Sequence, residues 1–95
     1  MIEIKIRDLA GSFAENKDVA RDIRLTKIMP ALEKNEDIIV NFDGVEGATQ
    51  SFVHALISDV IRKHGVQVLD KVSFKDCNET LKTIIGIVID YMQES

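Results

Sequence analysis

Three short segments with the patterns of β-strands alternate with longer segments of helical period, and this alternation constrains the fold more than any other feature. The strand-like segments are residues 2–6, 37–42 and 71–76, with the sequences IEIKI, DIIVNF and KVSFKD. Parallel strands need a long crossover connection, usually a helix, and the intervening segments have that length and period. The sequence therefore predicts the order β-α-β-α-β-α around a small, mainly parallel sheet.

The strand patterns also predict how the sheet is covered. Residues 2–6 and 71–76 alternate between apolar and polar side chains, whereas residues 37–42 form a continuous apolar run that ends in Asn41 and Phe42. Alternation is typical of strands with one wet face, and a continuous run is typical of a strand covered by its neighbours. We expect the middle segment to be the central strand of a two-layer α/β sandwich, with the helices on one face of the sheet.

Three helices are expected, over residues 18–34, 50–64 and 79–93. The first is irregular, because Pro30 lacks a main-chain N–H and disfavours helical geometry at Met29, which predicts a kink there. The second has a clean apolar half and stops at Gly65. The third begins after Asn78, a residue type that caps helix N-termini.

Length and composition exclude several classes of protein. With 95 residues, 45% of them hydrophobic, the chain suits a single domain over residues 1–95. The net charge is −4 and no Lys/Arg cluster occurs, so nucleic acid is not an expected partner. No apolar run reaches the roughly 20 residues of a membrane span. One cysteine and the lack of a leader-like N-terminus predict a cytoplasmic location.

The junction after the middle strand is the most informative place for function. It follows the carboxyl end of that strand, where ligands of open α/β sheets usually bind. Gly44 and Gly47 permit a tight turn, but neither of the nucleotide-loop patterns, GxGxxG and GxxxxGK[ST], occurs in the chain. Thr49 has the type and place of an N-cap for the second helix, and we take this structural role as the first interpretation of the polar triplet Thr49, Gln50 and Ser51.

A stripe of small and polar residues lies nearly opposite the apolar half of the second helix. Its members are Ser51, Ala55, Ser58 and Arg62. At helical spacing they share one face, which we expect to be exposed, small and flat. A phosphate on Ser51 would lie in the first turn and add about two negative charges to that face, which would make a switch for a docking partner.

The whole chain resembles the STAS-like domain family, small relatives of bacterial anti-sigma-factor antagonists. The resemblance rests on the order of three segments, FAENKDVARDIR, IIVNFDGVEGATQSFVHALI and VSFKDCNETLKTII. It implies the fold predicted above and a non-catalytic signalling module. Such a module would bind a histidine-kinase-like ATPase or a related regulator through the second helix, with Thr49, Gln50, Ser51, Ala55, Ser58 and Arg62 as contact residues.

The chain departs from the antagonists at their phosphorylation motif. They carry an aspartate and two serines where this chain has Thr49, Gln50 and Ser51, and their phosphorylated serine corresponds to Gln50. The kinase-controlled switch of the antagonists is therefore not transferred to this chain. Ser51 and Thr49 remain as candidate phospho-acceptors.

A phosphotransfer domain of receiver type is the alternative. Four acidic residues follow strand ends and could gather at one edge of the sheet, namely Asp8, Asp43, Glu46 and Asp76. Clustered carboxylates can hold Mg²⁺ or accept a phosphoryl group, with Thr49 and Lys75 as the hydroxyl and the lysine that such a site needs. The chain has too few strand–helix units for that fold, so solvated loop acids are the preferred interpretation.

The remaining candidate residues favour structural roles. Cys77 precedes the third helix, and only His54 and His64 could assist it as a nucleophile, so we expect a small buried side chain. These three residues do not have zinc-site spacing, and no metal or cofactor is expected. Ile87 and Tyr91 widen the apolar face of the third helix, and the edge strand at residues 2–6 is open to pairing, so either could support a homodimer.

Overall fold

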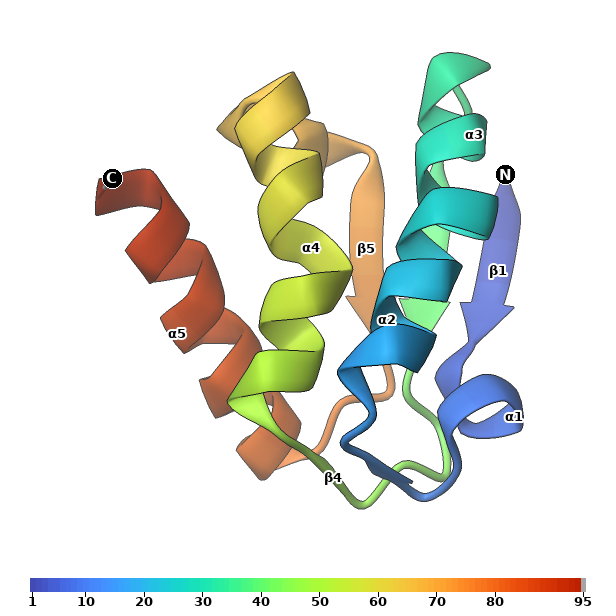
Figure 1. Cartoon of the computed structure of the whole chain (residues 1–95), viewed down its shortest axis with the longest axis vertical. Coiled ribbons are helices and arrows are strands. Elements are labelled where there is room, and N and C mark those ends of the chain that lie inside the picture. Colours follow the sequence, from blue (N-terminus) through green and yellow to red (C-terminus); the bar gives the residue numbers. More distant parts are fainter. Residues whose placement is uncertain (95) are drawn as a thin grey trace.

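The computed structural model describes residues 1–94, with side chains described to Gln93, and its main sheet has three parallel strands. They are β1 (Ile2–Lys5), β3 (Ile38–Asn41) and β5 (Val72–Lys75). The strand order is β1-β3-β5, so β3 lies in the middle, as predicted (Figure 1). The register pairs Ile4 with Val40 and Val40 with Phe74.

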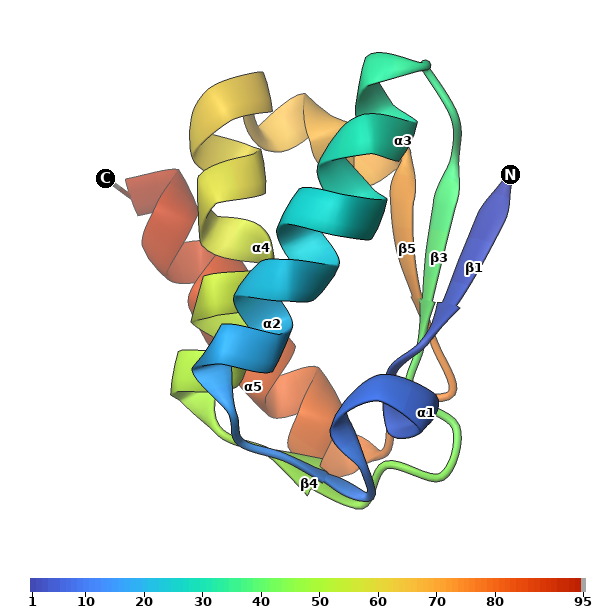
Figure 2. The same cartoon turned by 45° about the vertical axis from the view of Figure 1, so that its right-hand side comes forward.

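The long helices form one layer against one face of this sheet, which confirms the two-layer prediction (Figure 2). The helices are α1 (Ile6–Ala10), α2 (Lys17–Ile23), α3 (Met29–Glu33), α4 (Gln50–His64) and α5 (Glu79–Glu94). A 3₁₀ turn, η2 (Val66–Asp70), joins α4 to β5. The short helix α1 lies apart from the layer, at the carboxyl end of the sheet.

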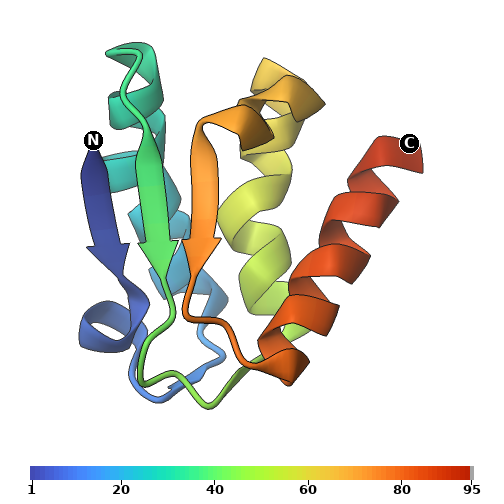
Figure 3. The same cartoon turned by 180° about the vertical axis from the view of Figure 1, so that it is seen from behind.

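The other face of the sheet is bare, as Figure 3 shows from behind. Glu3 and Lys5 of β1 and Ser73 and Lys75 of β5 are exposed there, while alternate residues such as Ile4 are buried toward the helices. This is the alternation expected from side chains that point to opposite faces of a strand. We call this surface the bare face.

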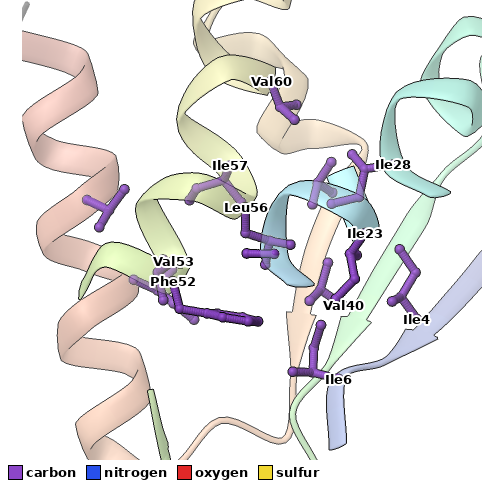
Figure 4. Packing of buried hydrophobic residues seen from close by; sticks show 14 of the residues in the cluster. Ile4, Ile6, Ile23, Ile28, Val40, Phe52, Val53, Leu56, Ile57 and Val60 are labelled. Atoms are coloured by element: carbon purple, nitrogen blue, oxygen red, sulfur yellow. The ribbon is translucent and has the colours of Figure 1, made fainter. Parts of the chain in front are cut away.

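One continuous hydrophobic cluster fills the space between the two layers. Figure 4 shows Phe52 and Leu56 of α4, Ile23 of α2, and Ile4 and Val40 of the sheet within this cluster, and all five are buried. Burial of large apolar side chains of this kind is the main favourable term in folding. The apolar half of α4 therefore lies at the centre of the core.

The irregular first helix contains a π-helical turn, η1 (Arg24–Ile28), between α2 and α3. The main-chain N–H of Met29 donates to the carbonyl of Arg24, five residues back. The predicted irregularity is present as this wide turn, and Pro30 follows it in the first turn of α3.

A second, two-stranded parallel sheet was not predicted. It joins β2 (Phe13–Ala14) to β4 (Gly47–Ala48), and the Thr49 N–H donates to the Ala14 carbonyl at 2.9 Å. Gly47 lies under the Phe13 ring, since an added Cβ would fall 3.0 Å from it. The small sheet thus ties the loop before α2 to the loop before α4 and fixes where α4 begins.

Candidate interaction surface on helix α4

Helix α4 lies in the middle of the helix layer, with α2 on one side and α5 on the other (Figure 1). Thr49 precedes it with extended backbone, φ −83° and ψ 155°, and its side-chain oxygen accepts a hydrogen bond from the Phe52 N–H at 3.0 Å. The N-cap prediction is therefore confirmed. The cap at the start of α5 is confirmed as well, because the Leu81 N–H donates to Oδ1 of Asn78 at 2.9 Å.

The predicted contact residues differ in their exposure to solvent. Gln50, Ser51 and Arg62 are exposed, and Ala55 is half-buried. The prediction that Ser58 belongs to the exposed stripe is wrong, because Ser58 is only 3% exposed and its hydroxyl lies 3.4 Å from Nδ1 of His54. A helix with one buried half would expose this position, but α4 has neighbours on both sides and exposes only a narrow strip.

An open groove runs between the first turns of α2 and α4. It has a volume of about 460 Å³ and is lined by Lys17, Gln50, Ser51, His54 and Ala55. We call these five residues the α4 surface. Lys17 brings a positive charge to the groove from α2, and no feature of the α4 sequence points to it. Only the pairing of β2 with β4, which fixes both helix starts, could have revealed it.

The α4 surface continues onto α5 through a pair of rings. The centroids of the His54 and Tyr91 rings are 6.3 Å apart, with the ring planes inclined by 60°. Tyr91 is 61% exposed, and Ile87 on the same helix is 46% exposed. These two apolar side chains, predicted to widen the face of α5, therefore lie at the surface and not in the core.

The main chain beneath the α4 surface is held from the π-helical turn. Nη1 of Arg24 donates to the Ala55 carbonyl at 2.7 Å and lies 3.3 Å from Oδ2 of Asp59, while the side chain of Arg24 is only 12% exposed. Asp59 also forms an ion pair with Arg62. A largely buried guanidinium with both a carbonyl and a carboxylate partner is a rigid link, so the position of α4 relative to α2 is fixed there.

Three of the four acidic residues at the strand ends lie together at the carboxyl edge of the sheet. Asp8, Asp43 and Asp76 line one depression, and Lys75, the lysine predicted for a receiver-like site, lines it with them, as do Lys5 and Arg7. Glu46 is not among its lining residues. Among the side chains of residues 1–93, no group of three or more acidic, histidine or cysteine residues is placed to hold a metal ion.

Cys77 lies in a loop before α5 and is half-buried, with Sγ 3.9 Å from the Lys75 carbonyl. Burial raises the pKa of this thiol above its ordinary value of 9.0; the positive charge of Lys82 opposes that rise and the negative charge of Asp76 adds to it. A thiol with a raised pKa is protonated near neutral pH, so it is a poor nucleophile.

Comparison with known proteins places this geometry in a family. Residues 19–82 match the family described as "STAS-like domain of unknown function (DUF4325)". The chain belongs to this STAS-like family. The matched region extends from α2 to the start of α5, so it contains β3, all of α4 and Arg24. No curated protein and no solved structure matches the chain significantly.

The STAS-like domain has no helix among its described residues that is both long and apolar enough to cross a membrane. Its longest helix, α5, includes Glu79, Lys82 and Asp90.

Proposed function

We propose that this STAS-like domain is a non-catalytic protein-interaction and signalling module of the cytoplasm. Its partner is a histidine-kinase-like ATPase or a related regulator, bound through the α4 surface. The observation that carries the proposal is the open groove at the start of α4, where Gln50 and Ser51 lie exposed beside Lys17. The groove coincides with the segment in which anti-sigma-factor antagonists, which the chain resembles, carry their phosphorylation motif.

Three observations support a non-catalytic role. The Thr49 hydroxyl accepts the Phe52 N–H and is half-buried, so it serves the helix cap. The raised pKa of Cys77 disfavours the thiolate. The carboxylates of Asp43 and Asp76 line an open depression, and within residues 1–93 no cluster of acidic side chains is placed to hold the Mg²⁺ that phosphotransfer needs. The Thr49 hydroxyl is thus occupied and the Cys77 thiol is poorly activated.

Ser51 is the better of the two phospho-acceptor candidates. It is exposed in the first turn of α4, whereas Thr49 is half-buried and serves as the cap. A phosphate on Ser51 would add about two negative charges next to Lys17 and His54, both of which line the same groove. Modification there would change the charge of the α4 surface and hence its affinity for a partner.

The test is a binding measurement with a purified histidine-kinase-like ATPase from the native host, chosen first from the neighbouring genes. Ser51→Asp and Ala55→Arg should each weaken binding at least tenfold, which corresponds to about 1.4 kcal/mol. Ser73→Asp is the matched control, because Ser73 is an exposed serine on the bare face. Unchanged thermal melting would show that each variant is folded.

The proposal fails if both α4 variants bind every specific partner as tightly as the unmodified chain does. It fails in another way if Ser73→Asp weakens binding as much as Ser51→Asp does, because the contact would then lie on the bare face or arise from overall charge. Enzymatic turnover lost on substitution of Asp43 would favour the phosphotransfer alternative.

A further inference from the structure

Strand β1 is an uncovered edge of the sheet. It pairs only with β3, and in Figure 3 it forms one margin of the bare face. The Ile2 N–H donates to the Asp37 carbonyl at 2.9 Å, so the main-chain groups of Ile2 and Ile4 point toward β3. In a parallel ladder the groups of the alternate residues, Glu3 and Lys5, then point outward. The outward N–H and C=O groups of Glu3 and Lys5 can form hydrogen bonds with another strand.

The space beside this edge is open. A groove of about 240 Å³ runs along β1 and is lined by Glu3, Ile4, Lys5, Asp8, Leu9 and Lys27. Leu9 of α1 is 42% exposed at this groove, which places an apolar side chain next to the strand. The groove gives a second strand access to the main chain of β1.

The charges on β1 are complementary to a second copy of the same strand. Glu3 and Lys5 have opposite charges, lie two residues apart and point to the bare face. If two copies of β1 align antiparallel about Ile4, Glu3 of each copy lies opposite Lys5 of the other. Both pairs occupy hydrogen-bonded positions, because these are the residues whose main-chain groups point outward. Ile4 then lies opposite Ile4 on the helix side.

We propose that two copies of this chain associate through β1, antiparallel and centred on Ile4. The result is a continuous six-stranded sheet with both helix layers on the same side. Opposite charges directly across an antiparallel pair stabilise it, and like charges destabilise it. The α4 surfaces of both copies remain uncovered and face the same way, so this association is compatible with partner binding there.

The side-chain contacts of Glu3 and Lys5 favour this arrangement. Oε2 of Glu3 accepts a hydrogen bond from Nδ2 of Asn41 at 3.0 Å and lies 3.7 Å from Nζ of Lys75. Neither contact uses Oε1, which is left for Lys5 of the second copy. Lys5 itself has no ion-pair partner among the side chains of residues 1–93.

Other alignments place like charges together. Alignment about Glu3 sets Glu3 opposite Glu3, and alignment about Lys5 sets Lys5 opposite Lys5. At the other margin of the sheet, β5 aligned on itself about Ser73 sets Lys71 opposite Lys75 and Asp70 opposite Asp76. On β1 the charge pattern thus favours alignment about Ile4 over the two neighbouring alignments, and only this alignment of β1 places opposite charges in both facing pairs.

The experiment measures association of the full chain by sedimentation velocity over concentrations up to the millimolar range, because an interface of one short strand is small and weak. The unmodified chain should move from monomer toward dimer. Glu3→Lys alone and Lys5→Glu alone should each raise the dissociation constant at least tenfold. A mixture of these two variants should recover association, because every facing pair is then opposite in charge.

Lys71→Glu is the matched control, since it makes the same change in net charge away from β1 and should leave association unchanged. Amide hydrogen exchange adds a structural readout, in which Glu3 and Lys5 should gain protection at high concentration and Phe74 should not. Circular dichroism shows that each variant is folded.

Three results would overturn the proposal. The first is an unmodified chain that stays monomeric at every concentration. The second is a dimer that Lys5→Glu does not weaken and Tyr91→Asp abolishes, which would place the interface on α5. The third is a mixture of Glu3→Lys and Lys5→Glu that associates no better than either variant alone.

Discussion

Replacing Thr49 by alanine removes the N-cap of α4 and tests how the core helix is held. In the native structure the Thr49 side-chain oxygen accepts the Phe52 N–H at 3.0 Å, and Phe52 is fully buried. Without the hydroxyl this N–H loses its partner in a place that water reaches poorly. N-cap losses cost about 0.5–2 kcal/mol, and the burial of Phe52 places this one at about 1–2 kcal/mol.

The loss in free energy converts into a shift of the melting temperature. Unfolding entropies are about 2.1 cal/mol/K per residue near 60 °C, which for 95 residues is about 0.2 kcal/mol/K. Thr49→Ala should therefore lower the melting temperature by about 5–10 °C. Thermal unfolding followed by far-UV circular dichroism measures the shift.

Thr49→Ser is the control for the lost methyl group. It keeps the hydroxyl and should melt within about 3 °C of the unmodified protein, since serine is as good an N-cap as threonine. If the alanine and serine variants melt at the same temperature, the hydroxyl is not the stabilising group and the assigned cap is wrong. A shift for alanine alone would confirm it.

Three further predictions concern burial, backbone conformation and pH. Ser58→Asp buries a charge at a position that is 3% exposed and should unfold the domain or destabilise it by about 3 kcal/mol or more in urea titrations, whereas Ser51→Asp should change stability by less than about 0.5 kcal/mol. Gly44→Ala should cost about 1–2 kcal/mol in the same assay, because Gly44 has φ +79° and an added Cβ would lie too close to the side chain of Arg7. Burial raises the pKa of Cys77, so near pH 8 a thiol reagent should alkylate the folded protein more slowly than the protein unfolded in urea. The free energy of unfolding should fall as pH rises above about 9, because Cys77 loses its proton more readily in the unfolded chain than in the folded one.

The sequence predicted those parts of the structure that local chemistry determines. Alternation located the edge strands, and the apolar run located β3. The ends of α4 were predictable because Thr49 caps one end, and Gly65 at the other end has φ +84° and donates its N–H to the Ile61 carbonyl at 2.7 Å. Asn78 marked the start of α5 for the same reason.

The features that the sequence did not predict depend on tertiary arrangement. The burial of Ser58 follows from the position of α4 between two other helices, and a helical wheel contains no information about neighbours. The pairing of Phe13–Ala14 with Gly47–Ala48 joins two loops far apart in the chain, and each strand is too short to show a period. Lys17 could be assigned to the α4 surface only after that pairing was known.

The π-helical turn affects how easily this segment can gain or lose a residue. It holds one residue more than an α-helix would, and an α-helix advances about 100° per residue. Deleting one exposed residue from Arg24–Ile28 would restore regular α-helical bonding and would leave Ala31 and Leu32, now buried, in phase with the core, because the wide turn covers about the same rotation with one residue more. The length of this turn, which includes the exposed Leu25 and Lys27, is therefore under looser constraint than the length of α2 or α3, where the loss of one residue would rotate buried side chains away from the core.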